Sequence, residues 1–138
     1  MIGLDTNVLA RYYVDDAGDA EAKRQRLAAR RLIDSGQALM VSKTVVLELE
    51  WVMRGYYGFT QTEVGSVLRH LLGLTHVTVE GREAVEQALA NSEAGLDFAD
   101  ALHHASYRAC ISVATFDDRR FARRAKRLGL APAVTVLA

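Results

Sequence analysis

The sequence predicts an α/β fold in which a central parallel β-sheet of about five strands is flanked by helices. The first observation is length, because 138 residues suit a single domain. The second is composition, with half of the residues hydrophobic and a quarter charged, as in an ordinary globular protein. The third is order, because short apolar runs alternate with helix-like segments, a pattern typical of parallel sheets covered by helices. No linker or repeat interrupts the pattern, so we predict one domain over residues 1–138.

Helix-capping residues delimit the elements of the first half of the chain. Asp5, Ser42 and Thr60 each precede a helix-like run, where their side chains can accept hydrogen bonds from the first amides. Gly36 ends a long helix rich in Ala and Arg. The expected order is strand 1–4, helix 8–14, helix 17–35, strand 39–41, helix 42–55, helix 60–72 and strand 77–79.

The second half continues the alternation. The expected order is helix 80–92, helix 97–109, strand 111–114, helix 118–128 and strand 134–136. Right-handed crossovers put the carboxyl ends of parallel strands at one edge of the sheet, where such folds keep their sites.

Several classes of protein are disfavoured by simple features. Cys110 is the only cysteine, so we expect neither an internal disulfide nor a cysteine-based zinc site. No apolar run is long enough to cross a bilayer, and the first residues lack the features of a signal peptide. We therefore expect a cytoplasmic protein.

The charges balance in total but not locally. The 17 Lys and Arg residues equal the 17 Asp and Glu residues, yet the basic residues gather in two blocks. Such blocks suit either a surface that faces phosphates or solvated helix faces, and each block alone fits both readings equally. The blocks are Lys23, Arg24, Arg26, Arg30 and Arg31, and Arg119, Arg120, Arg123, Arg124, Lys126 and Arg127. The candidates for RNA binding are Arg119, Arg120, Arg123, Arg124 and Arg127.

Two predicted strands lead into an aspartate. Strand 1–4 runs into Asp5, and strand 111–114 is followed closely by Asp117. Both carboxylates should therefore lie at the same edge of the sheet, although each also suits a helix N-cap.

Glu48 and Glu50 lie two residues apart on the predicted helix 42–55 and should face opposite ways. Glu48 neighbours the predicted apolar stripe, where a carboxylate is costly unless something compensates its charge. Glu50 points away and has Arg54 four residues later as a surface partner. We expect Glu48 to be functional and Glu50 structural. The stripe consists of Val45, Leu49, Val52 and Tyr56.

Asp97 and Asp100 open the predicted helix 97–109. Asp97 is its natural N-cap, and Asp100 falls in the first turn, where negative charge suits the helix dipole. Asp100 also shares a predicted face with His104 and Tyr107, directed toward the edge that carries the other acids.

Asp5, Glu48, Asp100 and Asp117 are thus expected to converge from distant parts of the chain. Clustered carboxylates repel one another, so such a group needs a cation. Oxygen ligands without cysteine or obligatory histidine fit Mg²⁺, with Mn²⁺ as a substitute. A metal of this kind can activate water and stabilise the charge that develops on a phosphodiester.

Four segments carry a family resemblance. They are Ile2-Gly3-Leu4-Asp5-Thr6-Asn7-Val8-Leu9, Val41-Ser42-Lys43-Thr44-Val45-Val46-Leu47-Glu48-Leu49, Leu96-Asp97-Phe98-Ala99-Asp100-Ala101-Leu102-His103 and Ala114-Thr115-Phe116-Asp117. In this order they resemble the acidic segments of PIN-domain nucleases. Their spacing and the total length resemble VapC, the toxin of type II toxin–antitoxin pairs.

This resemblance implies a Mg²⁺-dependent endoribonuclease that acts as a toxin and pairs with a VapB-type antitoxin. It implies a homodimer with RNA as substrate. Carried over residue by residue, the catalytic acids are Asp5, Glu48, Asp100 and Asp117, with Asp5, Asp100 and Asp117 as metal ligands. Supporting positions are Thr6, Asn7, Asp97 and Thr115.

Alternatives remain open. A small phosphoacceptor signalling domain also has acids at strand ends, but it would want an acidic pair near the N-terminus and a lysine near the C-terminal strands. A PIN nuclease outside toxin–antitoxin systems, or a PIN domain that only binds RNA, would share the four segments. Tyr12 and Tyr13 follow Asp5 by about two helical turns, and they suit either core packing or a wall that binds a base.

Overall fold

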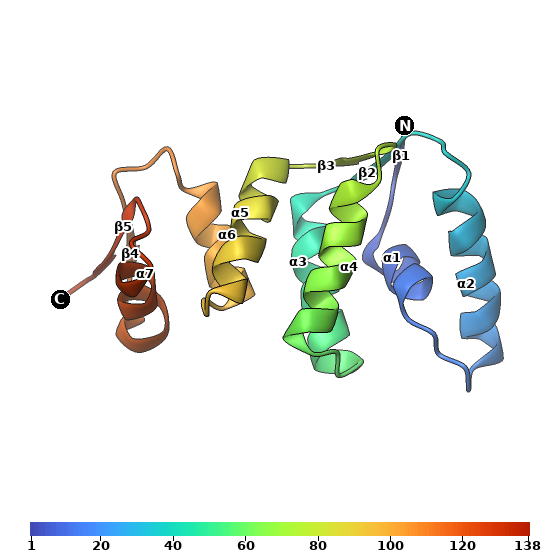
Figure 1. The fold of residues 1–138 in the computed structure, drawn as a ribbon, viewed down its shortest axis with the longest axis horizontal. Helices are drawn as coiled ribbons and strands as arrows, with labels where there is room; N and C mark the ends of the chain where they lie inside the picture. The colour runs from blue at the N-terminus through green and yellow to red at the C-terminus, as the bar shows by residue number, and fades with distance from the viewer. The chain divides into compact units, whose positions relative to one another are not determined.

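The computed structural model describes residues 1–138, and the chain divides into two compact units, Met1–Arg82 and Glu83–Ala138 (Figure 1). Helices and parallel strands alternate in both, so the predicted α/β class is confirmed. The units are described separately. No helix in the structure combines the length and apolar character that crossing a membrane requires.

The first unit contains a parallel sheet in the order β1-β2-β3. Ile2 pairs with Leu39, and Val41 pairs with Val79. The elements are β1 (Ile2–Gly3), α1 (Thr6–Tyr13), α2 (Ala20–Ile33), β2 (Leu39–Val41), α3 (Lys43–Trp51), the π-helical turn η1 (Val52–Tyr56), α4 (Gln61–Gly73) and β3 (Val77–Val79).

The second unit contains the parallel pair β4-β5, in which Val113 is opposite Val134. Its elements are α5 (Arg82–Glu93), α6 (Phe98–Ser106), β4 (Ser112–Thr115), the π-helical turn η2 (Asp118–Ala122), α7 (Arg123–Arg127) and β5 (Ala133–Val136).

The predicted caps position these helices. The Ser42 hydroxyl accepts a hydrogen bond from the Val45 amide at 3.2 Å and begins α3. Thr60 and Glu63 form a reciprocal capping box at the start of α4. Gly36 has a φ of +80°, which favours glycine where the chain turns after α2. These local bonds explain why most predicted element boundaries lie within a few residues of those observed.

The core of the first unit lies beside its central strand. Leu39 and Val41 of β2 are fully buried, as are Leu9 of α1 and Leu49 of α3. Burying each such side chain contributes about 1.5–3 kcal/mol to folding. The sheet is thereby fixed against α1 and α3, the two helices that carry Thr6 and Glu48.

Two predictions differ from the structure. The five parallel strands form sheets of three and two, whereas the sequence predicts one sheet, because strands of two to four residues specify direction but not which edges pair. The predicted helices 42–55 and 118–128 each contain a π-helical turn. In those turns, the Tyr57 amide bonds to the Val52 carbonyl and the Ala122 amide to the Asp117 carbonyl. A single turn with hydrogen bonds between residues five apart is too short to change the apolar pattern of the sequence.

Candidate acidic site

Asp5 lies directly beyond β1, where it caps α1. Its Oδ1 atom accepts a hydrogen bond from the Thr6 amide at 2.8 Å, and its side chain is exposed. A carboxylate at this helix N-terminus also faces the positive end of the helix dipole. Local bonding therefore orients the Asp5 carboxylate toward solvent at the carboxyl end of a parallel strand.

Thr6 connects α1 to α3. The Thr6 side chain is buried, and its hydroxyl donates a hydrogen bond to Oε1 of Glu48. Glu48 is thus held by the residue that follows Asp5 in the chain. The first unit thus brings two of the predicted acids to the N-terminus of α1, where Thr6 links them.

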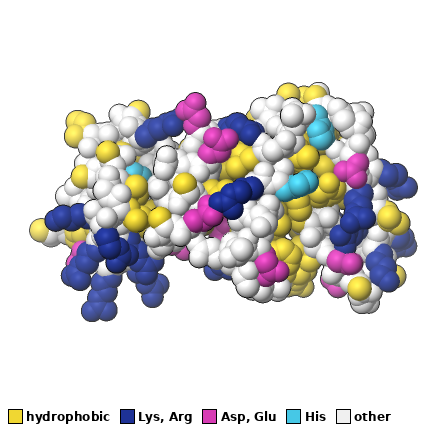
Figure 2. Space-filling view, viewed as in Figure 1, with side chains coloured by type: hydrophobic (Ala, Val, Ile, Leu, Met, Phe, Trp, Pro, Cys, Tyr) yellow, Lys and Arg dark blue, Asp and Glu magenta, His cyan; other side chains and the backbone are white.

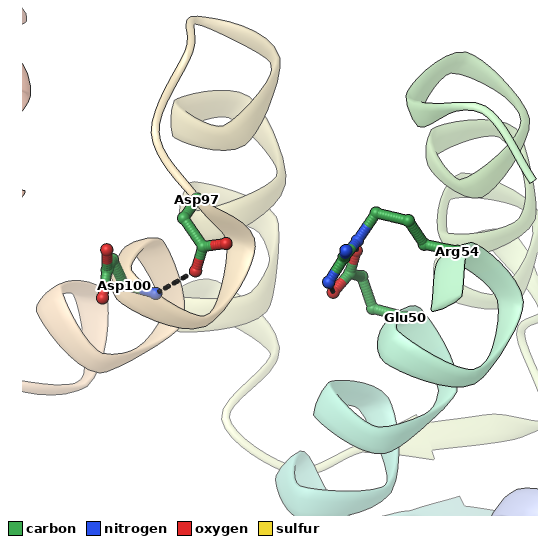
Figure 3. A network of polar contacts seen from close by, with 4 residues as sticks. All are labelled: Glu50, Arg54, Asp97 and Asp100. Atoms are coloured by element: carbon green, nitrogen blue, oxygen red, sulfur yellow. Dashed lines mark hydrogen bonds and ion pairs between the residues drawn. The ribbon is translucent and has the colours of Figure 1, made fainter. Parts of the chain in front are cut away.

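In the second unit, three acids line one pocket of about 490 Å³, together with two arginines. The acids are Asp97, Asp100 and Asp117, and the arginines are Arg120 and Arg124. Asp97 caps α6, and its Oδ1 atom accepts a hydrogen bond from the Asp100 amide at 3.2 Å (Figure 3). The pocket therefore gathers the acids of two predicted segments.

Asp117 is held at the carboxyl end of β4 by bonds on both sides. Its amide donates to the Thr115 hydroxyl at 3.0 Å, and its Oδ1 accepts from the Arg120 amide at 2.9 Å, which caps η2. Thr115 thus positions the Asp117 backbone, and its supporting role in catalysis stays a prediction.

The carboxyl of Asp100 has a raised pKa. Burial raises the pKa of its carboxyl, and the charges of Asp97 and Asp117 raise it further. The positive charges of His103 and Arg124 oppose that rise. The ionised form of Asp100 is consequently disfavoured in the folded protein, because its carboxyl is partly buried and faces two other carboxylates.

The donor set suits a hard divalent cation. The acids offer only carboxylate oxygens, the ligands that Mg²⁺ takes in proteins. No group of three or more acidic, histidine or cysteine side chains is already arranged around a metal position. The carboxylate donors fit a divalent ion of this kind. A cation bound beside Asp100 would offset the negative charge of its carboxylate.

Comparison with known proteins identifies the family. The PIN domain family matches residues 2–127 of the chain. The chain belongs to the PIN domain family. No curated protein matches the sequence. PIN domains are generally metal-dependent nucleases, typically with Mg²⁺, so the family supports a hydrolase that acts on nucleic acid. It also leaves the phosphoacceptor alternative without support.

The predicted faces of α3 are wrong in this PIN domain. Glu48 is exposed, whereas Glu50 has only 8% of its side chain exposed and pairs with Arg54 at 2.8 Å (Figure 3). The buried apolar face includes Val46, Leu49 and Met53, so only Leu49 of the predicted stripe is buried. Residues 46, 49, 50 and 53 follow the i, i+3, i+4, i+7 spacing of one α-helical face, so the face is displaced by about one residue from the predicted one and includes Glu50. Glu48 keeps its candidate role through its bond to Thr6.

His104 also differs from expectation. His104 is buried, and its Nε2 atom bonds to the Pro132 carbonyl at 2.8 Å, so it does not share the exposed face of Asp100. Asn7 lines a separate cavity of about 260 Å³ with residues of α1 and α2. The supporting role of Asn7 stays a prediction.

The arginines of the basic block in the second unit lie in three different environments. Lys and Arg side chains gather over α7 in the space-filling view (Figure 2). Arg120 and Arg124 line the acidic pocket, while Arg123 pairs with Asp118 at 2.8 Å. Arg119 and Arg127 are exposed. Arg120 and Arg124 are among the predicted candidates for RNA binding, but their place in the acidic pocket was not predicted, although they lie three and seven residues after Asp117.

The exposed arginines give a testable role for this block. In metal-free buffer, the Arg119→Gln/Arg127→Gln double variant should bind single-stranded RNA with a salt slope shallower by about 1.4, since each lost phosphate contact removes about 0.7. Arg123→Gln is the matched control, because Asp118 already neutralises its charge. Filter binding at several salt concentrations measures the slopes. Equal slopes for the double variant and the wild type would contradict the RNA contact.

Proposed function

We propose that this PIN domain is a Mg²⁺-dependent endoribonuclease of the VapC type. The proposal assigns catalysis to Asp5, Glu48, Asp100 and Asp117, with Asp5, Asp100 and Asp117 as metal ligands. The supporting observation is the acidic pocket of Asp97, Asp100 and Asp117, in which Asp100 carries a raised pKa. The finer assignments rest on the four sequence segments that resemble VapC.

The two units would act as one domain over residues 1–138. The family match runs across the boundary between Arg82 and Glu83, which supports a single PIN domain. In each unit an acid stands at the carboxyl end of a parallel strand, Asp5 after β1 and Asp117 after β4.

The side chains have separable tasks in this scheme. A divalent cation bound by the acids would lower the pKa of a water molecule and offset charge on the phosphodiester. The Thr6 hydroxyl orients Glu48, and the Thr115 hydroxyl orients Asp117. Arg120 and Arg124 line the pocket and suit the non-bridging oxygens of a phosphate, which guanidinium groups bind in bidentate fashion.

Two exposed aromatic side chains suit a surface that binds a protein partner. Trp51 and Tyr56 are 59% and 76% exposed, and the Trp51 ring lies over Gly55. Large exposed aromatic side chains are characteristic anchors of protein interfaces. We infer a VapB-type antitoxin and a homodimer as partners.

Two experiments test these partners. Co-expression with the product of a short upstream reading frame, followed by co-purification, tests the antitoxin. Sedimentation of the isolated protein tests the dimer.

A cleavage assay tests the nuclease itself. The purified protein should cut single-stranded RNA with Mg²⁺ or Mn²⁺, stop when a chelator is added and recover when the metal is restored. A DNA strand of the same sequence is the control for endoribonuclease specificity. Cleavage that persists with chelator, and also in Asp5→Asn, would contradict the metal site.

A further inference from the structure

A second pocket lies in the first unit, at the opposite end of α1 from Asp5. It has a volume of about 500 Å³ and is lined mainly by aromatic and basic side chains from α1, α2 and α4. The side chains that carry the argument are Tyr12, Tyr13, Arg26, Arg30 and His70, which we call the aromatic–arginine pocket. At 1.5 Å per residue, its α1 end lies about 12 Å along the helix from the Asp5 cap.

The aromatic rings of the pocket are arranged by their own contacts. Tyr12 and His70 are nearly parallel, with ring centroids 6.3 Å apart and an interplanar angle of 28°. Tyr13 lies edge-on to both, at 4.9 Å from Tyr12 and 5.5 Å from His70. The Tyr13 hydroxyl bonds to Nδ1 of His70 at 2.8 Å. The rings of Tyr12 and His70 therefore hold a common orientation, which suits stacking with another flat ring.

Arginines supply positively charged hydrogen-bond donors to the pocket. Arg26 is held by Asp15, which contacts its Nη1 at 3.0 Å, while its buried Nε atom has no hydrogen-bond partner. Such a buried donor costs free energy unless a ligand or a water molecule accepts a hydrogen bond from it. Arg30 is exposed at the same pocket. The pocket thus offers guanidinium donors beside aromatic faces.

Two carboxylates stand beside the pocket arginines, and Asp34 is itself part of the pocket lining. Asp15 pairs with Arg26, and Asp34 accepts a hydrogen bond from the Tyr12 hydroxyl at 3.0 Å. Helix α2 nevertheless carries five basic residues against Glu21 alone. An anion with a flat ring fits both features, whereas an apolar peptide would leave the arginine donors without acceptors.

We propose that the aromatic–arginine pocket binds one nucleotide of single-stranded RNA, with its base stacked on Tyr12 and His70 and its phosphate on Arg26 and Arg30. The proposal rests on the proposed function, because it adds a binding position for the same substrate strand. Proteins that bind single strands combine stacking aromatic residues with basic side chains along the backbone in this way. A volume of about 500 Å³ is also in the range of small-ligand sites.

Fluorescence anisotropy with a labelled oligoadenylate RNA tests the site on the whole protein in chelator, where cleavage does not interfere. A strand of about eight nucleotides suits a single-strand binding site. Tyr12→Leu removes the stacking ring and should raise Kd at least about fivefold, whereas Tyr12→Phe keeps the ring and should stay within about twofold of the wild type. Circular dichroism checks that each variant folds.

A matched pair of arginines separates a pocket from a general basic surface. Arg30→Gln should raise Kd about fivefold and reduce the salt slope by about 0.7, whereas Arg31→Gln, exposed on the same helix but outside the pocket, should change Kd less than twofold. Equal effects of the two variants, unchanged Kd in Tyr12→Leu, or no RNA binding by the wild type would each overturn the proposal. RNA binding with the expected contrasts but without cleavage in Mg²⁺ would support the pocket and refute the nuclease.

Discussion

Asp100→Asn should lower RNA cleavage at least a hundredfold, about 2.7 kcal/mol of barrier, while raising the melting temperature of the metal-free protein. Activity falls because a proposed metal ligand loses its charge. Stability rises because burial and the charges of Asp97 and Asp117 disfavour the ionised Asp100. The Tm of chelated Asp100→Asn should therefore lie above that of the chelated wild type.

The stabilisation should depend on pH in a defined direction. The pKa of Asp100 is raised in the folded protein, so the folded state holds this proton more tightly than the unfolded state. The stability that the protonated form contributes is complete below the unfolded pKa and is lost as pH rises through the folded pKa. The Tm difference between Asp100→Asn and wild type should therefore be small in acid and grow toward neutral pH.

Thermal melts in chelator and in millimolar Mg²⁺ check both effects. Mg²⁺ should stabilise the wild type by mass action and stabilise Asp100→Asn much less. Asp118→Asn is a control in the same unit, because Asp118 pairs with Arg123 and does not line the acidic pocket. A lower Tm for chelated Asp100→Asn than for chelated wild type would show that Asp100 mainly stabilises the first turn of α6.

Glu48→Gln and Glu50→Gln should have opposite signatures although they lie two residues apart. Glu48→Gln should reduce cleavage at least about tenfold with little loss of stability, because Glu48 is exposed and held by Thr6. Glu50→Gln should keep most of the activity but cost about 1–2 kcal/mol of folding free energy. That cost is below the ~3–5 kcal/mol of a fully buried pair because Arg54 is half exposed.

Single-turnover cleavage and thermal melts of both variants separate these outcomes. Glu50→Gln should lower the Tm by about 4–8 °C, as expected for 1–2 kcal/mol in a domain of this size. Thr6→Val provides a further comparison, because it removes the hydroxyl that orients Glu48 but leaves both carboxylates. If Glu48→Gln destabilised the fold while keeping full activity, Glu48 would be a structural residue and the site assignment would fail.

The sequence predicts the elements that local bonding controls. Asp5, Ser42, Thr60 and Asp97 each cap a helix as expected, because a cap depends on residues within one turn. The parallel direction of the strands also follows from their alternation with helices. The grouping of Asp97 with Asp100 was visible for the same reason, since three residues separate them on one helix.

Features that depend on distant contacts were harder to predict. The burial of Glu50 and His104 reflects side chains that find a partner, Arg54 for one and the Pro132 carbonyl for the other. From the sequence alone both residues are expected to be exposed, because their side chains are polar. The division of the strands into β1-β2-β3 and β4-β5 also lies beyond local patterns, because short strands specify their direction but not their neighbours.

Three of the candidate acids also serve as helix N-caps: Asp5 for α1, Asp97 for α6 and Asp117 for η2. Asparagine caps a helix about as well as aspartate, whereas alanine loses the capping bond and about 1 kcal/mol. The exchange of one carboxylate oxygen for an amide nitrogen thus separates chemistry from folding at these positions. An inert but intact protein, suitable for crystallising an uncut RNA complex, is best made with asparagine, while alanine scanning there would confuse misfolding with inactivity.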